Sequence, residues 1–124
     1  MQDDPRYDDV VEDIASFFER QLRIFESHGA RRLVLDPGFG FGKTLEHNYS
    51  LLNNLDRFIA FGYPVMAGLS RKSMINRALD IRPGEALNGT TVLNTIALLK
   101  GASILRVHDV KEAAEAIKLV SLLC

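Results

Sequence analysis

The chain has 124 residues, 47% of them apolar and 25% charged, which is enough for one ordinary globular domain with a hydrophobic core. Its net charge of −1 excludes the basic surface of a typical nucleic-acid-binding protein, and no apolar run approaches the roughly 18 residues of a membrane span. Cys124 is the one cysteine, so an intrachain disulfide is excluded, and the acidic start MQDDPRYDD differs from a secretion signal. We therefore expect a cytoplasmic protein with neither nucleic acid nor membrane as a partner.

The first elements expected along the chain are a helix, a strand and a second helix. The spacing of apolar residues predicts a helix from about residue 9 to 28, with one apolar face made by Val11, Ile14, Phe18, Leu22 and Phe25. The short apolar run at 33–35 is typical of a strand buried on both faces. The inner face of the following helix, which ends near Gly62, is expected to contain Leu51, Leu52, Leu55, Phe58 and Ile59.

The second half of the sequence repeats this alternation. Strands are expected at 64–67 and 104–107, and helical segments at about 71–79 and 85–100, interrupted by Arg82-Pro83-Gly84. Asp109 and Glu112 have the spacing of a capping box at the start of a last helix. The residues expected to face inward from that helix are Val110, Ala114, Ile117 and Val120.

A helix followed by three strand–helix units predicts an α/β fold with a parallel sheet and right-handed crossovers. Two architectures fit this order: an open doubly wound sheet, or part of a (β/α)8 barrel. A complete barrel takes about 250 residues, so three strands would supply little more than its C-terminal half.

The loop after the first strand, in LVLDPGFGFGKTLEHN, is rich in glycine but matches neither common phosphate motif. A P-loop ending in Gly42-Lys43-Thr44 requires glycine at position 37, where Pro37 stands. The spacing of Gly38, Gly40 and Gly42 also differs from the dinucleotide pattern G-x-G-x-x-G. These glycines would let the backbone approach a ligand closely. Phe39 and Phe41 belong either to the core or to a surface that stacks on a flat heterocycle.

Charged residues follow all three strands, where ligands bind in both candidate architectures. They are Asp36 after the first strand, Arg71 and Lys72 after the second, and Arg106 and His108 at the end of the third. Each has a structural alternative. Asp36 would cap its own loop or pair with Arg106, and the two cations near a helix start would be surface charges.

The functional interpretation assigns these residues to an anionic, partly planar ligand. The two oxygens of Asp36 suit a ligand edge with adjacent N–H donors. Arg71 and Lys72 oppose the helix dipole, which suggests an acidic or anionic ligand as their partner. Arg106, expected within a buried strand, needs an anion, either Asp36 or a ligand phosphate, and His108 would add a second donor.

Three segments resemble the C-terminal half of bacterial dihydropteroate synthase: LVLDPGFGFGKTLEHNYSLL, PVMAGLSRKSMI and ASILRVHDVKEA. The resemblance covers nearly the whole chain. It implies that residues 1–124 form a partial pterin-binding (β/α)8 barrel domain without its N-terminal half. The implied reaction joins 6-hydroxymethyl-7,8-dihydropterin diphosphate to 4-aminobenzoate and releases diphosphate, with Mg2+ as a helper.

The resemblance also implies residue roles. The positions that would contact the pterin are Met1, Asp36, Gly68 and Lys72. Those that would contact 4-aminobenzoate are Phe41, Ser70 and Arg71. Arg106 and His108 would anchor the diphosphate and, with Lys72, form the catalytic set. The family's metal-binding asparagine has no counterpart in this chain, so no metal ligand is expected here.

Two other interpretations stay open. One is a barrel enzyme that transfers a methyl group from a reduced folate, although this reaction needs no diphosphate anchor. The other is a non-catalytic half-barrel whose charged residues are structural ion pairs. We also expect the chain alone to be inactive. Its exposed half-barrel edges are expected to associate, most simply as a homodimer.

Overall fold

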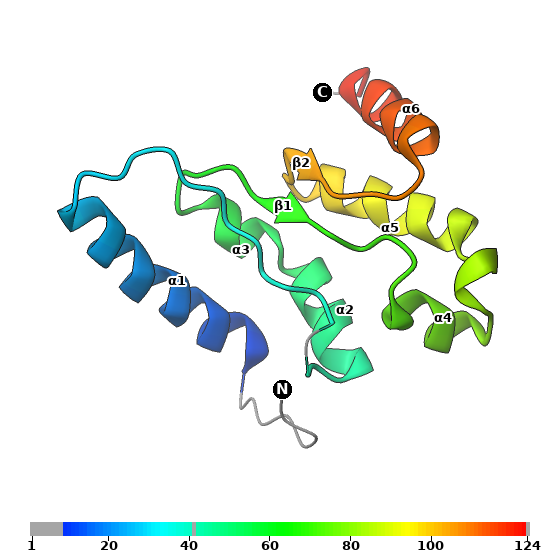
Figure 1. Ribbon diagram of the computed structural model, residues 1–124, viewed down its shortest axis with the longest axis horizontal. Coiled ribbons are helices and arrows are strands. Elements are labelled where there is room, and N and C mark those ends of the chain that lie inside the picture. Colours follow the sequence, from blue (N-terminus) through cyan, green and yellow to red (C-terminus); the bar gives the residue numbers. More distant parts are fainter. Residues whose placement is uncertain (1–8, 41, 124) are drawn as a thin grey trace.

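This computed structural model describes residues 9–40 and 42–123, which contain six α-helices and two short strands (Figure 1). The helices are α1 (Val10–Ser27), α2 (Leu45–Asn53), α3 (Asp56–Ile59), α4 (Ser73–Leu79), α5 (Leu87–Leu99) and α6 (Val110–Ser121). The strands are β1 (Met66–Ala67) and β2 (Ile104–Leu105), and a 3-10 turn, η1 (Pro83–Glu85), precedes α5. Met1, Phe41 and Cys124 lie outside the described residues.

The strand segments pair in parallel, in the order in which they occur along the chain. Met66 pairs with Ile104 in β1 and β2, and Leu35 forms an isolated parallel bridge to Val65. The Leu35 amide donates to the Pro64 carbonyl at 2.9 Å, so this segment lies directly beside the start of β1. The predicted α/β fold with three parallel segments is confirmed, although the segments are shorter than expected and the first is a single bridge.

Helix α1 forms where the apolar spacing predicts it. The Asp9 carboxylate accepts hydrogen bonds from the amides of Val11 and Glu12 at 3.1 and 3.2 Å and so caps the first turn. The apolar face packs on α2 and α3, where Phe18 meets Phe58 edge to face with ring centroids 5.5 Å apart. This packing attaches α1 to the same core that supports the strands.

The two faces of the small sheet differ, which corrects the expectation that the strands are buried on both. Leu35, Val65 and Ala67 are buried in the core, whereas the Val34 side chain is 48% exposed. Because side chains alternate between faces, the open face also receives Asp36, Met66, Gly68, Ile104 and Arg106. Within the described part of the chain, no helix covers this face sufficiently to bury Val34.

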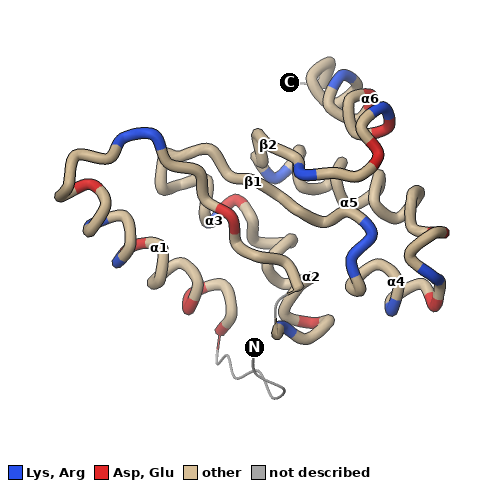
Figure 2. The backbone as a smooth tube through the Cα atoms, viewed as in Figure 1, with Lys and Arg blue, Asp and Glu red and all other residues tan. Residues whose placement is uncertain are grey.

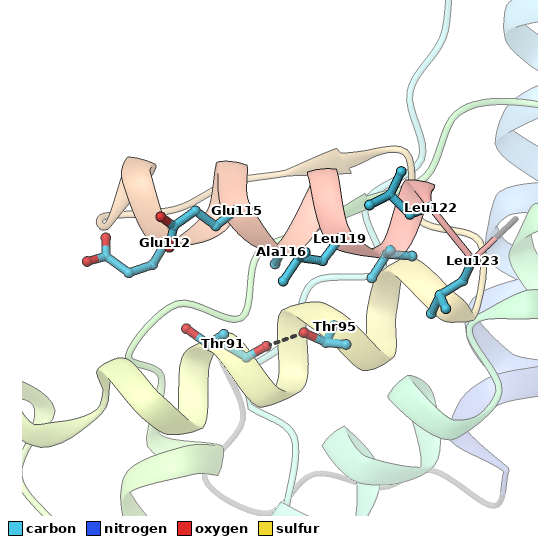
Figure 3. A pocket seen from close by; sticks show the side chains of 9 residues that line it. Thr91, Thr95, Glu112, Glu115, Ala116, Leu119, Leu122 and Leu123 are labelled. Carbon is cyan, nitrogen blue, oxygen red and sulfur yellow. Dashed lines mark hydrogen bonds between the residues drawn. The ribbon is translucent and has the colours of Figure 1, made fainter.

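The predicted inward face of α6 is wrong except at Val120. Val110 is 70% exposed, and Ala114 and Ile117 are exposed as well. Ala113, Ala116 and Val120 are buried instead, because small side chains let α6 lie along α5. An open groove of about 590 Å3 lies between these helices. Figure 3 shows Ala116 and Leu119 on the side of α6 that faces Thr91 and Thr95 of α5. Asp109 makes no capping hydrogen bond, so the predicted capping box is also wrong.

Helices α4 and α5 begin two residues later than predicted, and the expected interruption between them is confirmed. Asp80 ends α4 in the left-handed region, at φ 54°, and Pro83 starts the 3-10 turn that leads into α5. None of the helices in the described ranges combines the length and apolar character that crossing a membrane requires.

Candidate active site

The ends of the three strand segments converge on the open face of the sheet. Asp36 follows the first segment, Gly68 follows β1, and Arg106 follows β2. Figure 2 shows basic positions on the connection from β1 to α4 and next to β2. The Arg106 Nη1 atom lies 3.7 Å from Asp36 Oδ2, which is within ion-pair distance but too long for a hydrogen bond. The predicted convergence of charges on one rim is therefore confirmed.

Gly68 makes room for the Arg106 guanidinium. A Cβ atom at position 68 would lie 2.6 Å from Nη2 and 3.0 Å from Nε of Arg106. Real Cβ atoms essentially never approach other atoms within 3.0 Å, so a side chain here would displace the guanidinium. Glycine at this position allows the cation to lie flat against the end of β1.

The Arg106 side chain is more accessible than the sequence indicated. It is 56% exposed, which corrects its predicted burial within a strand. Among the described residues its guanidinium has the ion pair with Asp36 but no hydrogen bond. Its N–H donors therefore remain available to an anion at the open face.

The glycine loop is held from inside by hydrogen bonds. Gly38, Gly40 and Gly42 all have positive φ, between 73° and 93°, a region that other residues adopt at a cost. The Gly38 amide donates to Asp36 Oδ1 at 2.9 Å, and the Gly40 amide donates to Asn48 Oδ1 at 2.8 Å. Asn48 is buried on α2, so the loop is attached to the core. Asn48 was not predicted as a site residue, because one amide side chain in a helix carries no distinctive pattern.

Phe39 in this loop belongs to the core. Its side chain is 1% exposed, so it offers no ring for stacking on a ligand. The other candidate ring, Phe41, lies outside the described residues.

Two lysines bind backbone carbonyls of the same loop. Lys43 Nζ donates to the Gly38 carbonyl at 2.6 Å, and Lys72 Nζ donates to the Phe39 carbonyl at 2.7 Å. Burial lowers the pKa of both ammonium groups, and the nearby Arg106 charge lowers the pKa of Lys72 further. The Asp36 carboxylate opposes both shifts. Lys43 was not predicted as a site residue, because its position before a helix fits an ordinary surface charge equally well.

Arg71 is directed at protein groups. Its Nε and Nη2 donate to the two oxygens of Asp109 at 3.0 and 3.1 Å, and its Nη1 donates to the Pro83 carbonyl at 2.7 Å. Its backbone has φ 55°, and its amide donates to the hydroxyl of buried Thr90 at 3.0 Å. The hydrogen bonds with Asp109 raise the pKa of Arg71 and lower that of Asp109. This corrects the expectation of a ligand partner for Arg71, because its acidic partner is Asp109 of the protein.

Ser70 and His108 form a second link between the same two loops. The Ser70 Oγ atom lies 2.7 Å from His108 Nδ1 and accepts a hydrogen bond from the His108 backbone amide at 3.2 Å. Ser70 is 6% exposed. A cavity of about 120 Å3 beside this pair is lined by Gly68, Ser70, Lys72, Arg106, Val107 and His108.

The side chains at the rim are mainly basic, with Asp36 as the acid among them. No three His, Cys, Asp or Glu side chains of the described ranges are grouped as cation ligands. The acid at the rim, Asp36, faces Arg106 and influences two lysines, an arrangement that suits an anionic ligand better than a metal ion.

The structure therefore brings together five of the predicted site residues: Asp36, Gly68, Lys72, Arg106 and His108. Ser70 adjoins them through His108, and the guanidinium of Arg71 is engaged by Asp109. Met1 and Phe41 lie outside the described residues, and their predicted roles stay predictions.

The profile of one protein family, described as "Pterin binding enzyme", matches residues 1–108. The chain belongs to the pterin-binding enzyme family. Relatives within this family include dihydropteroate synthase of Escherichia coli strain K12, which is 48% identical over 122 residues. That alignment covers 97% of this chain but 43% of the relative. The chain thus spans less than half the length of the curated family members that it matches.

Solved structures of pterin-binding enzymes share this arrangement of elements. Dihydropteroate synthase of Yersinia pestis, in a complex with a sulfonamide drug, aligns with a TM-score of 0.93 at 44% identity, covering 98% of this chain and 45% of that one. The Thermus thermophilus enzyme in complex with 4-aminobenzoate gives a TM-score of 0.90 at 44% identity, covering 96% of this chain and 47% of that one.

Proposed function

We propose that this chain is the anion-binding part of a dihydropteroate synthase. The reaction would join 6-hydroxymethyl-7,8-dihydropterin diphosphate to 4-aminobenzoate and release diphosphate. One observation carries the proposal: Lys72, Arg106 and His108 line one small cavity beside Asp36, in a chain 48% identical to a named dihydropteroate synthase.

The proposed architecture is the C-terminal half of a (β/α)8 barrel, with residues 1–124 as a partial pterin-binding domain. The parallel segments in chain order support this proposal, and no further strand pairs with either outer segment among the described residues. A barrel would continue its sheet at both of these edges. Coverage of 43% to 47% of the relatives' length is consistent with a half-barrel. Association through the open edges, either as a homodimer or with the rest of a barrel, is part of the same proposal.

The pterin would bind where Asp36 meets the open face. The carboxylate would accept hydrogen bonds from the aminopyrimidine edge, while Lys72 would donate to the ring and Gly68 would allow close approach. Met1, which lies outside the described residues, keeps the pterin contact that the family resemblance implies. The 4-aminobenzoate would lie toward Ser70 and Phe41, and Arg71, engaged by Asp109, would act there by shaping the loop.

The leaving diphosphate would bind at Arg106 and His108. As the bond between carbon and the diphosphate oxygen breaks, negative charge grows on the leaving group, and preorganised cations and N–H donors stabilise that charge. Lys72 adds a second basic side chain beside the cavity. The aromatic amine of 4-aminobenzoate is nucleophilic without deprotonation, so positioning would supply most of the remaining rate enhancement. Mg2+, which we propose the complete enzyme requires, is given no role in these steps.

A chimaeric enzyme tests the proposal directly. The segment of the E. coli enzyme that aligns with this chain would be replaced by the chain itself, and diphosphate release would be measured with both substrates and Mg2+. We expect turnover by the chimaera, loss of turnover on Arg106→Ala, and none from the isolated chain. The exposed Arg23→Ala on α1, whose partner is Glu19, is a matched control. A folded chimaera without turnover, or one that transfers a methyl group from a reduced folate, would contradict the proposal.

A further inference from the structure

The Ser70 hydroxyl contacts His108 at two points. The His108 backbone amide donates to Oγ at 3.2 Å, and the ring nitrogen Nδ1 lies 2.7 Å from the same oxygen. The first bond has a fixed direction, because a backbone N–H can only donate. It occupies one of the two lone pairs of the hydroxyl and leaves its proton free for the ring.

Donation from this proton to Nδ1 determines the tautomer of a neutral imidazole. If Nδ1 accepts, Nε2 must carry the ring proton. When the imidazole is charged, Nδ1–H donates to the remaining lone pair of Oγ, and Nε2 is again protonated. In both states the hydroxyl holds the ring in one orientation, and Nε2 has no hydrogen-bond partner among the described residues.

We propose that Ser70 is a positioning residue for His108: its hydroxyl orients the imidazole and keeps Nε2 protonated as a donor to an anion in the cavity beside Arg106. This differs from the role that family resemblance gives Ser70, a contact with 4-aminobenzoate. It rests on the proposed function in one respect, namely that the anion is a diphosphate.

The Ser70 hydroxyl can be removed without separating the two loops that it joins. The bidentate pair of Arg71 and Asp109 joins the same two loops independently, with Nε–Oδ2 and Nη2–Oδ1 distances of 3.0 and 3.1 Å. Removing the Ser70 hydroxyl would therefore free the imidazole while the second link holds the loops together. A change in anion affinity would then report on the ring and not on a general loss of structure.

The test is a double-mutant cycle on the 124-residue chain, with inorganic diphosphate as the probe. Loss of one hydrogen bond of ordinary strength corresponds to about fivefold, so Ser70→Ala should weaken diphosphate binding by about that factor. His108→Ala should weaken it at least as much. Because Ser70 acts through His108, adding Ser70→Ala to His108→Ala should cause no further loss. The exposed Ser121, whose hydroxyl donates to the Lys118 carbonyl, supplies Ser121→Ala as the control.

NMR spectroscopy of the His108 ring tests the proposed tautomer independently of binding affinity. At alkaline pH the ring 15N shifts of wild-type His108 should show an unprotonated Nδ1 and a protonated Nε2, and Ser70→Ala should give a mixture of tautomers. Ser70→Thr should restore the wild-type shifts, because it retains the hydroxyl. An equal affinity loss in both backgrounds, or unchanged shifts in Ser70→Ala, would overturn the proposal. If the wild-type chain binds no diphosphate, the proposed anion site is refuted. The 15N shifts then still test whether Ser70 orients His108.

Discussion

Replacing Gly68 with alanine should weaken anion binding with little loss of stability. The new Cβ would lie 2.6 Å from Nη2 of Arg106, whereas ordinary Cβ contacts begin near 3.4 Å, so the guanidinium must move by about 0.8 Å. The displaced group is the end of a flexible, largely exposed side chain, so the fold can accommodate the shift. The Gly68 φ angle lies outside the left-handed region, so alanine adds no backbone strain.

The expected loss follows from what Arg106 would contribute. A hydrogen bond between charged groups is worth about 1.5–3 kcal/mol, and losing it would weaken diphosphate binding by about 10- to 150-fold. Titration calorimetry of the 124-residue chain with inorganic diphosphate measures this change. Unfolding in guanidinium chloride should show a free energy of unfolding within about 1 kcal/mol of wild type.

Gly89→Ala is the matched control, with the opposite expected outcome. Its Cβ would lie 2.5 Å from the Cγ2 of Ile75, a buried branched side chain that cannot move aside. Overpacking costs about 1–3 kcal/mol, and the better helix propensity of alanine returns at most about 1 kcal/mol. This variant should lose stability but retain diphosphate affinity. If Gly68→Ala binds diphosphate as wild type does, the assignment of Arg106 to the anion is refuted.

Three further variants or titrations test the loops around the site. Arg71 lowers the pKa of Asp109, so the ionised carboxylate stabilises the folded chain. This stabilisation is complete above the ordinary aspartate pKa and is lost as the pH falls through the lowered pKa of the folded state. The melting temperature of Asp109→Asn should therefore fall less than that of wild type on acidification. An NMR titration of Lys72 should give a midpoint below the ordinary lysine value, and bound diphosphate should raise it; an unshifted midpoint would contradict its burial. Asn48→Ala removes two partly buried hydrogen bonds and should cost about 2 kcal/mol in chemical unfolding, with faster hydrogen exchange at the Gly40 amide. A wild-type exchange rate would show that the loop does not depend on Asn48.

Local patterns predicted the order of elements and the meeting of the strand ends. Hydrophobic spacing placed α1, and alternation of short apolar runs with helical segments placed the parallel segments. Because parallel strands point the same way, their ends share one edge, and this brings Asp36 near Arg106 without any knowledge of the rest of the fold. The individual ligand roles of these residues stay predictions.

The errors arose where a partner distant in sequence changed the role of a residue. Asp109 has the spacing of a helix cap, but Arg71, 38 positions earlier, binds its carboxylate. A bidentate, charge-assisted pair is stronger than a neutral capping bond, so the distant partner takes precedence over the local one. The face of α6 was misjudged for a related reason. Helices α5 and α6 lie close together, so the small side chains of Ala113 and Ala116 are buried between them and the larger Ile117 is not. The apolar spacing of the sequence indicates which residues are hydrophobic but takes no account of their size.

The two links between the β1–α4 and β2–α6 loops also determine when the site forms during synthesis. Ser70 and Arg71 leave the ribosome 38 residues before their partners, His108 and Asp109. Until those partners emerge, the first loop has neither link, and the pair with Asp109 cannot stabilise the left-handed backbone that Arg71 adopts in the folded chain. Packing within each strand–helix unit is local and fast, whereas these links close long loops. The chain would therefore acquire its hydrophobic core progressively, and its anion-binding geometry in one late step.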